Sequence, residues 1–144
     1  MCVALIVMLS IAPLVFARAD STLYENGPYG PDADAWLVSN GNVVADTFAL
    51  TGNATVTGFQ FWAWLLPGDF VSTAKVSITS QAFGGTTYFD QTVNFAPSDC
   101  HVNAYGYHVC DESSTFNGPH LGDGTNWLNL QNAMTLNGDS VLLG

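Results

Sequence analysis

Apolar and polar residues alternate with a period of two along much of this chain, which is the pattern of a β-strand with one buried face. The clearest case is residues 71–83, where every second side chain is apolar: Ala74, Val76 and Ile78. The side chains between them are polar and are expected to face water: Lys75, Ser77 and Thr79. Residues 86–95 continue the pattern after Gly84-Gly85, a pair that predicts a hairpin turn. We therefore expect an antiparallel hairpin over residues 71–95.

Similar strand-length segments recur on both sides of this hairpin, and no long helical pattern separates them. They are rich in Val, Thr, Phe, Tyr and Trp, and they cover residues 21–25, 35–39, 42–50, 55–66, 105–110, 126–131 and 140–143. Asn40-Gly41 predicts a tight turn, whereas residues 27–34, 97–103 and 113–125 are predicted to be irregular. The sequence thus predicts an all-β fold: an antiparallel two-layer β-sandwich, jelly-roll or Ig-like, with roughly seven to nine short strands.

Residues 59–66 are apolar on both faces of their predicted strand, so something other than water must cover one face. We assign one alternate set to the core between the sheets: Phe59, Phe61, Ala63 and Leu65. The other set then points outward: Gln60, Trp62 and Trp64. Residues 126–131 present a related outward set: Trp127, Asn129 and Gln131.

Flat indole rings beside amide side chains suit a carbohydrate ligand, because sugar rings stack on aromatic faces while their hydroxyls bond to amides. The six outward residues are therefore the predicted ligand-binding set. The alternative is that the tryptophans belong to the core, or that residues 27–34 and 113–125 cover them, since large aromatic side chains are usually buried.

The two ends of the sequence indicate how the domain is bounded. Residues 2–16 form an apolar run that is short for a membrane span, and Ala17-Arg18-Ala19 follows as a cleavage pattern. We interpret residues 1–19 as a secretory signal peptide, although no basic residue precedes the apolar run, and residues 20–144 as the β-sandwich domain. A membrane anchor and a buried core segment are the alternatives. The last predicted strand stops almost as it begins, so we expect a C-terminal truncation with an open edge.

Charge narrows the range of partners. Without the signal peptide, Lys75 is the only Lys or Arg side chain, against twelve acidic residues. Nucleic acids and anionic membranes are bound through Lys and Arg, so we expect no nucleic acid partner and no membrane association after signal cleavage.

Two cysteines remain in the domain, Cys100 and Cys110, and an exported chain meets an oxidising medium, which favours a disulfide between them. The rival interpretation is a zinc site that adds His101 and His108, but the spacing matches no familiar zinc motif. Free thiols are the third alternative.

Sequence signatures of catalysis are lacking. Two pairs of carboxylates could serve glycoside hydrolysis, Asp32/Asp34 and Asp111/Glu112, but nothing else in the sequence marks that reaction. We therefore predict no catalytic residues and no enzymatic activity. We predict no cofactor, although calcium has weak candidate ligands in predicted turns: Asp32, Asp34, Asp123 and Asp139. Such residues also favour turns for purely local reasons.

Three segments resemble a group of small secreted bacterial proteins that carry a PEP-CTERM sorting signal: LYENGPYG at residues 23–30, WAWLLPGDF at 62–70 and NWLNLQNAMTLNGD at 126–139. The resemblance spans most of the domain and implies export, surface association and an all-β fold, but it brings no catalytic residues. The Pro-Glu-Pro motif, hydrophobic helix and basic tail of that group do not follow Gly144, so we expect a chain that is either truncated or released.

Together these features favour a secreted, non-enzymatic surface or extracellular-matrix protein. A carbohydrate-binding module is the alternative, and a glycoside hydrolase is a distant third. We expect a glycan or other surface proteins as partners, and self-assembly is a further expectation.

Overall fold

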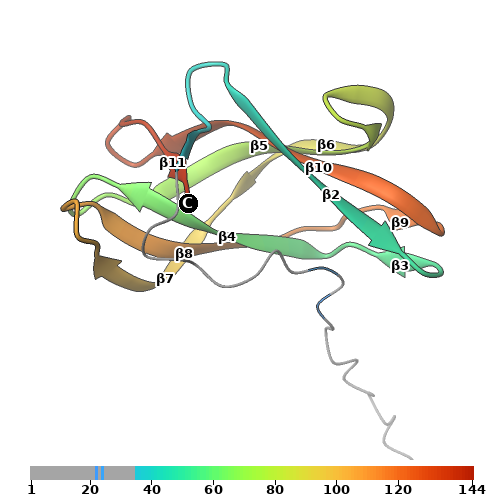
Figure 1. Cartoon of the computed structure of the whole chain (residues 1–144), viewed down its shortest axis with the longest axis horizontal. Helices are drawn as coiled ribbons and strands as arrows, with labels where there is room; N and C mark the ends of the chain where they lie inside the picture. The colour runs from blue at the N-terminus through green and yellow to red at the C-terminus, as the bar shows by residue number, and fades with distance from the viewer. Residues whose placement is uncertain (1–21, 23, 25–34) are drawn as a thin grey trace, which may run out of the picture.

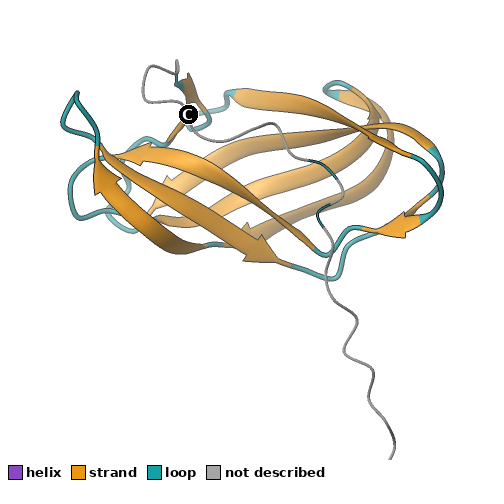
Figure 2. Ribbon diagram, turned by 60° about the horizontal axis from the view of Figure 1, so that its bottom comes forward, coloured by secondary structure: helices purple, strands orange, loops and turns teal. Residues whose placement is uncertain are grey.

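The computed structural model describes Thr22, Tyr24 and residues 35–144, and strands and loops make up this part of the chain (Figure 2). The strands are β1 Trp36–Leu37, β2 Val43–Leu50, β3 Ala54–Thr55, β4 Gly58–Leu65, β5 Val71–Gln81, β6 Gly84–Asn94, β7 Ala96–Val102, β8 His108–Thr115, β9 His120–Leu121, β10 Gly124–Thr135 and β11 Leu142–Leu143. Four of them are two-residue pairings, and two of these, β1 and β11, lie in the predicted strand segments 35–39 and 140–143. The longer strands match the other predicted segments of the described part except β7, which was not predicted.

Two antiparallel sheets face each other (Figure 1). One has the strand order β1-β11-β4-β8-β7, and the other has the order β2-β10-β5-β6. The small pair β3-β9 adjoins them. The predicted all-β, antiparallel sandwich is confirmed.

The core lies between the sheets and is built by alternation, as predicted. On β4, Ala63 and Leu65 are buried, and Phe59 and Phe61 pack against the core. The apolar set of β5 is fully buried: Ala74, Val76 and Ile78. The sheets are joined at Phe95, where the chain leaves β6 and enters β7, and its ring meets Phe61 edge-on at 5.3 Å between centroids.

The tight turn at Asn40-Gly41 is confirmed. Both residues have positive φ, 58° and 87°, and the Asn42 N–H donates to the Ser39 carbonyl over 3.2 Å. Two successive left-handed residues define a type I′ turn, for which Asn-Gly is the preferred pair.

The predicted turn at Gly84-Gly85 is displaced toward the N-terminus. Gln81 pairs with Gly84, so the chain reverses at Ala82-Phe83 and both glycines belong to the start of β6. Phe83 takes the positive φ, 57°, although a bulky residue rarely does so. The side-chain oxygen of Asn129, on β10, accepts a hydrogen bond from the Phe83 N–H and holds this residue in place.

Two segments predicted to be irregular are largely strand. Residues 97–103 lie almost wholly in β7, which tolerates Pro97 because β7 is an edge strand. The irregularity survives only between Ser98 and His101, where Asp99 has a φ of 46°. In residues 113–125, β8 continues to Thr115 and β9 forms. Pairing with distant strands overrides the local turn propensity in both cases.

The predicted signal peptide of residues 1–19 and the predicted loop of residues 27–34 lie outside the described residues, and so does most of the predicted strand of residues 21–25. Within the described part, no helix is long and apolar enough to cross a bilayer.

The Cys100–Cys110 disulfide is present and links β7 to β8, with the two Cα atoms 4.1 Å apart. It confirms the pairing predicted from the sequence over the zinc interpretation.

Replacing both cysteines by alanine is expected to lower the free energy of unfolding by about 2–3 kcal/mol, because the cross-link restricts a short loop of the unfolded chain. Urea denaturation of the double variant and of the oxidised parent measures this difference. Equal midpoints and slopes for the two proteins would contradict the expectation.

Candidate ligand-binding site

The outer face of the β2-β10-β5-β6 sheet carries mostly polar side chains in ordered rows. Cross-strand pairing aligns them in three rows: Thr47, Trp127, Thr79 and Thr87; Ala45, Asn129, Ser77 and Asp90; Val43, Gln131, Lys75 and Thr92. Three of the six residues predicted to bind a ligand thus follow one another along β10 on this face: Trp127, Asn129 and Gln131. One inward-facing residue lies between each of them and the next.

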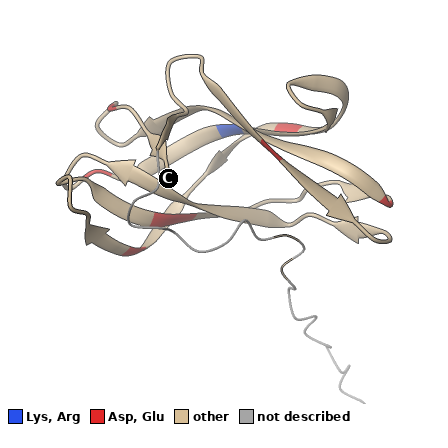
Figure 3. Ribbon diagram, viewed as in Figure 1, with Lys and Arg blue, Asp and Glu red and all other residues tan. Residues whose placement is uncertain are grey.

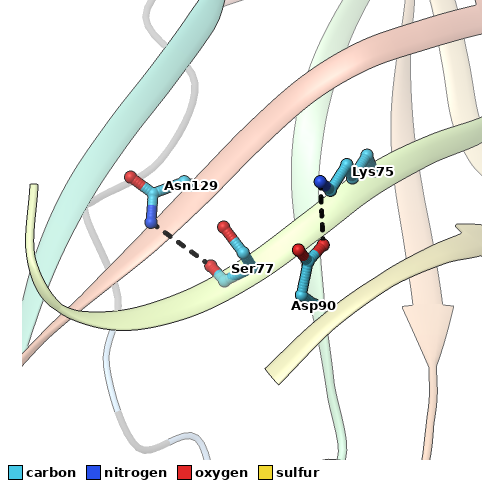
Figure 4. A network of polar contacts seen from close by, with 4 residues as sticks. All are labelled: Lys75, Ser77, Asp90 and Asn129. Carbon is cyan, nitrogen blue, oxygen red and sulfur yellow. Dashed lines mark hydrogen bonds and ion pairs between the residues drawn. The ribbon is translucent and has the colours of Figure 1, made fainter. Parts of the chain in front are cut away.

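The tip of the β5–β6 hairpin turns back over this face (Figure 1). Asn129 holds it there: its side-chain oxygen accepts from the Phe83 N–H at 3.2 Å, and its side-chain nitrogen donates to the Thr79 hydroxyl at 2.9 Å. The same nitrogen lies 3.5 Å from the Ser77 carbonyl oxygen (Figure 4). Asn129 is only 3 % exposed, and both ends of its amide are engaged. It therefore positions the hairpin and has little capacity left for a ligand.

The same fold-back explains why Ser77 and Thr79 are buried although the sequence predicts that they face water. The alternation pattern correctly predicted that both side chains lie on the outer face. It could not show that a neighbouring hairpin covers that side.

A hollow of about 210 Å³ lies between the hairpin and the sheet. Its lining includes Phe83 and Gly84 from the hairpin, Thr87 and Asp90 from β6, and Gln131 from β10. Phe83 is 69 % exposed, so its ring stands largely in solvent at the edge of the hollow. Trp127 is half-buried directly across from Thr79, another lining residue.

Charge at the hollow is nearly balanced. The Lys75 Nζ lies 3.1 Å from Asp90 Oδ1 (Figure 4), and Lys75 is the only Lys or Arg of the described residues (Figure 3). Both side chains are substantially exposed, so this ion pair contributes little to stability. It does leave the hollow without a strong charge of either sign.

The other predicted ligand residues lie on the opposite outer face of the molecule, on β4. Trp64 is only 6 % exposed because Tyr105 stacks on it at 5.8 Å and Tyr107 lies 5.7 Å away, measured between ring centroids. Trp62 is half-buried beside His101, and Gln60 is exposed. The six residues therefore do not form one site: the sandwich separates Gln60, Trp62 and Trp64 from Trp127, Asn129 and Gln131.

A cover over Trp64 was expected from residues 27–34, which lie outside the described residues, or from residues 113–125. The Tyr105–Tyr107 segment covers it, and the segment of residues 113–125 that was expected to do so is largely strand. Phe83, Thr87 and Asp90 were not predicted as site residues, because only the folded hairpin brings them to the hollow.

The calcium candidates do not converge in the described part of the chain. Asp123 and Asp139 flank the two ends of β10, a strand of 12 residues, which separates them by tens of ångströms. Asp123 Oδ1 accepts a hydrogen bond from the Gly52 N–H at 3.1 Å, which is a turn-stabilising role. Asp32 and Asp34 lie outside the described residues, and the described residues contain no group of three or more His, Cys, Asp or Glu side chains that could hold a metal.

The carboxylate pair Asp111/Glu112 is split between the two faces of β8, because successive strand residues point to opposite sides. Glu112 points into the core and is 0 % exposed, with its Oε1 accepting from the Val71 N–H at 3.0 Å. Burial raises the pKa of Glu112 to about 7, and the charge of Asp111 adds to the effect. The hydrogen bond from Val71 opposes it. A carboxyl group closed off from solvent in this way cannot reach a sugar bound at the surface.

Comparisons with models of known protein families, with curated proteins and with solved structures found no match to this chain.

The buried Glu112 predicts that the protein loses stability as the pH rises. Between about pH 4.5 and pH 7 the folded state keeps this proton while the unfolded chain releases it, so the free energy of unfolding falls across this window. The loss is roughly 3 kcal/mol for a pKa difference of this size. In Glu112→Gln this component should be absent, which denaturation at pH 5 and pH 8 can measure.

Asp90→Asn provides the matched control, because it removes an exposed carboxylate from the opposite sheet. It should leave the pH dependence nearly as in the parent. Identical pH profiles for the parent and Glu112→Gln would contradict the assignment to Glu112.

Proposed function

We propose that this chain is a secreted, non-enzymatic surface or matrix protein that binds a neutral glycan on the outer face of the β2-β10-β5-β6 sheet. The observation that carries the proposal is the polar hollow beneath the β5–β6 hairpin, with the half-buried Trp127 beside it. Aromatic rings and amide groups at one site are the side chains that sugar recognition uses.

The size of the hollow favours one sugar ring rather than a large ligand. Pockets for drug-sized molecules run from roughly 300 to 1,000 Å³, and this hollow is smaller. Trp127 and Thr47 continue the row that begins with the lining residues Thr87 and Thr79. A longer chain could therefore place one ring in the hollow and its neighbour along this row.

Electrostatics favour a neutral ligand. The chain has a formal net charge of −10, which repels anionic polymers. Lys75 already pairs with Asp90, so the hollow offers no uncommitted cation among its described residues.

The carboxylate arrangement supports binding without hydrolysis. Glycoside hydrolysis usually needs two carboxyl groups on either side of the scissile bond. Asp90 is the only carboxylate among the described residues that line the hollow, and the pair Asp111/Glu112 belongs to the other sheet. Export is supported by the apolar leader pattern of residues 1–19 and by the disulfide, which is typical of an oxidising compartment.

Trp127→Ala is expected to weaken binding to a neutral oligosaccharide by roughly tenfold or more, because it removes the stacking surface beside the hollow. Gln131→Ala should weaken it less, since one hydrogen-bonding group is lost. A glycan array identifies the oligosaccharide, and calorimetric titration of the parent and the variants measures the affinities.

Trp62→Ala is the matched control, since it also truncates a half-buried tryptophan on an outer sheet face. It should retain the affinity of the parent. A loss with Trp62→Ala but not with Trp127→Ala would move the site to the other sheet, and an array without any bound glycan would remove the proposal.

A further inference from the structure

β6 is an outer strand of its sheet, and no other described strand pairs with its free side. One hydrogen bond shows which residues of β6 bond to β5: the Phe95 N–H donates to the Ser72 carbonyl over 3.2 Å. Opposite residues of an antiparallel pair alternate between bonded and non-bonded positions. Gln91 and Val93 therefore bond to β5, whereas three residues direct their backbone groups to the free edge: Asp90, Thr92 and Asn94.

Two other edge strands, β7 and β2, carry features that hinder pairing with another chain. β7 contains Pro97 and the irregularity at Asp99. On β2, the edge-directed Thr47 N–H is already bonded to the Asp46 carboxylate, at 2.7 Å.

Residues 89–94 of β6 have none of these protections. They pair with β5 without a register shift and contain no proline. Their one charged side chain, Asp90, is neutralised by Lys75. Thr92 and Asn94 are exposed beside it. This segment is therefore open for strand addition.

We infer that this edge pairs with the same edge of a second copy of the chain, antiparallel, about a two-fold axis through Thr92. The register sets Thr92 against Thr92 and sets Asp90 of each copy against Asn94 of the other. The residues whose backbone groups are free then meet one another and form about six main-chain hydrogen bonds.

The side chains of this register are complementary. The Asp90 carboxylate can accept a hydrogen bond from the Asn94 amide, and threonine pairs are favourable across strands. Moving the axis to Asp90 would place two carboxylates opposite each other, which is unfavourable. The sequence of the edge thus favours the register centred on Thr92 over the one centred on Asp90, whichever ligand the sheet face binds.

The pairing has a distinct salt dependence. Each copy has a formal net charge of −10, so the two copies repel each other at low ionic strength. Added salt screens this repulsion, whereas the strand pairing itself involves no ion pair between copies. The dimer should therefore strengthen as salt is added.

Sedimentation equilibrium of the full chain tests the inference over a range of protein and salt concentrations. The parent should dimerise, with a dissociation constant that falls as salt increases. Thr92→Lys should raise this constant by about tenfold or more, because two lysines then meet on the axis. Thr92→Pro should do the same without disturbing β5, since the Thr92 N–H points to the free edge. Thr47→Lys, the same change on the opposite edge of this sheet, should leave the constant unchanged.

Amide hydrogen exchange locates the contact. At high protein concentration, the amides of Thr92 and Asn94 should become protected, and in Thr92→Lys the Asn94 amide should stay unprotected. Circular dichroism confirms the fold of each variant, and if Thr92→Pro does not fold, Thr92→Lys alone decides. A parent that stays monomeric at every concentration, or equal effects of Thr92→Lys and Thr47→Lys, would overturn the inference.

Discussion

The structure depends on one constraint: the sandwich has a single apolar core, and alternate residues of both sheets must fill it. Ala63 and Leu65 of one sheet and Val76 and Ile78 of the other are among the side chains buried there. Because the period of a strand is two, each inward side chain fixes its neighbours on the outer face. The side chains that alternate with this core set lie on the outer faces. The candidate site and the aromatic side chains outside the core are among them.

The two outer faces have become different surfaces. On the β4 side, Tyr105 and Tyr107 close over Trp64 and bury it in an aromatic cluster. On the β10 side, Asn129 draws the hairpin tip over the sheet and encloses a polar hollow instead. The difference arises from the groups that cover each face. Aromatic rings exclude water from Trp64, whereas the backbone and hydroxyl groups around the hollow can still form hydrogen bonds.

Much of the fold follows from local alternation, but the candidate site does not. The core set Phe59, Phe61, Ala63 and Leu65 could be assigned from residue order alone, as could the turn at Asn40-Gly41. Sheet membership could not, because it depends on pairing between distant strands, and so nothing local placed Trp62 and Trp127 on opposite faces. The same limit applies to the turn at Phe83, which is stabilised by a side chain 46 positions away.

The hollow and the free edge of β6 share one residue, Asp90, which forms the ion pair with Lys75. Asp90 lines the hollow and also lies in the segment of β6 inferred to pair with a second copy. A two-fold axis that joins edge strands in one sheet runs perpendicular to that sheet, so both hollows of the dimer would open on the same side. Two adjacent sites of this kind suit a polymer with repeating sugars, since binding of one unit raises the effective concentration of the next. Under the proposed function, two such sites on one dimer would hold a long glycan more firmly than either site alone.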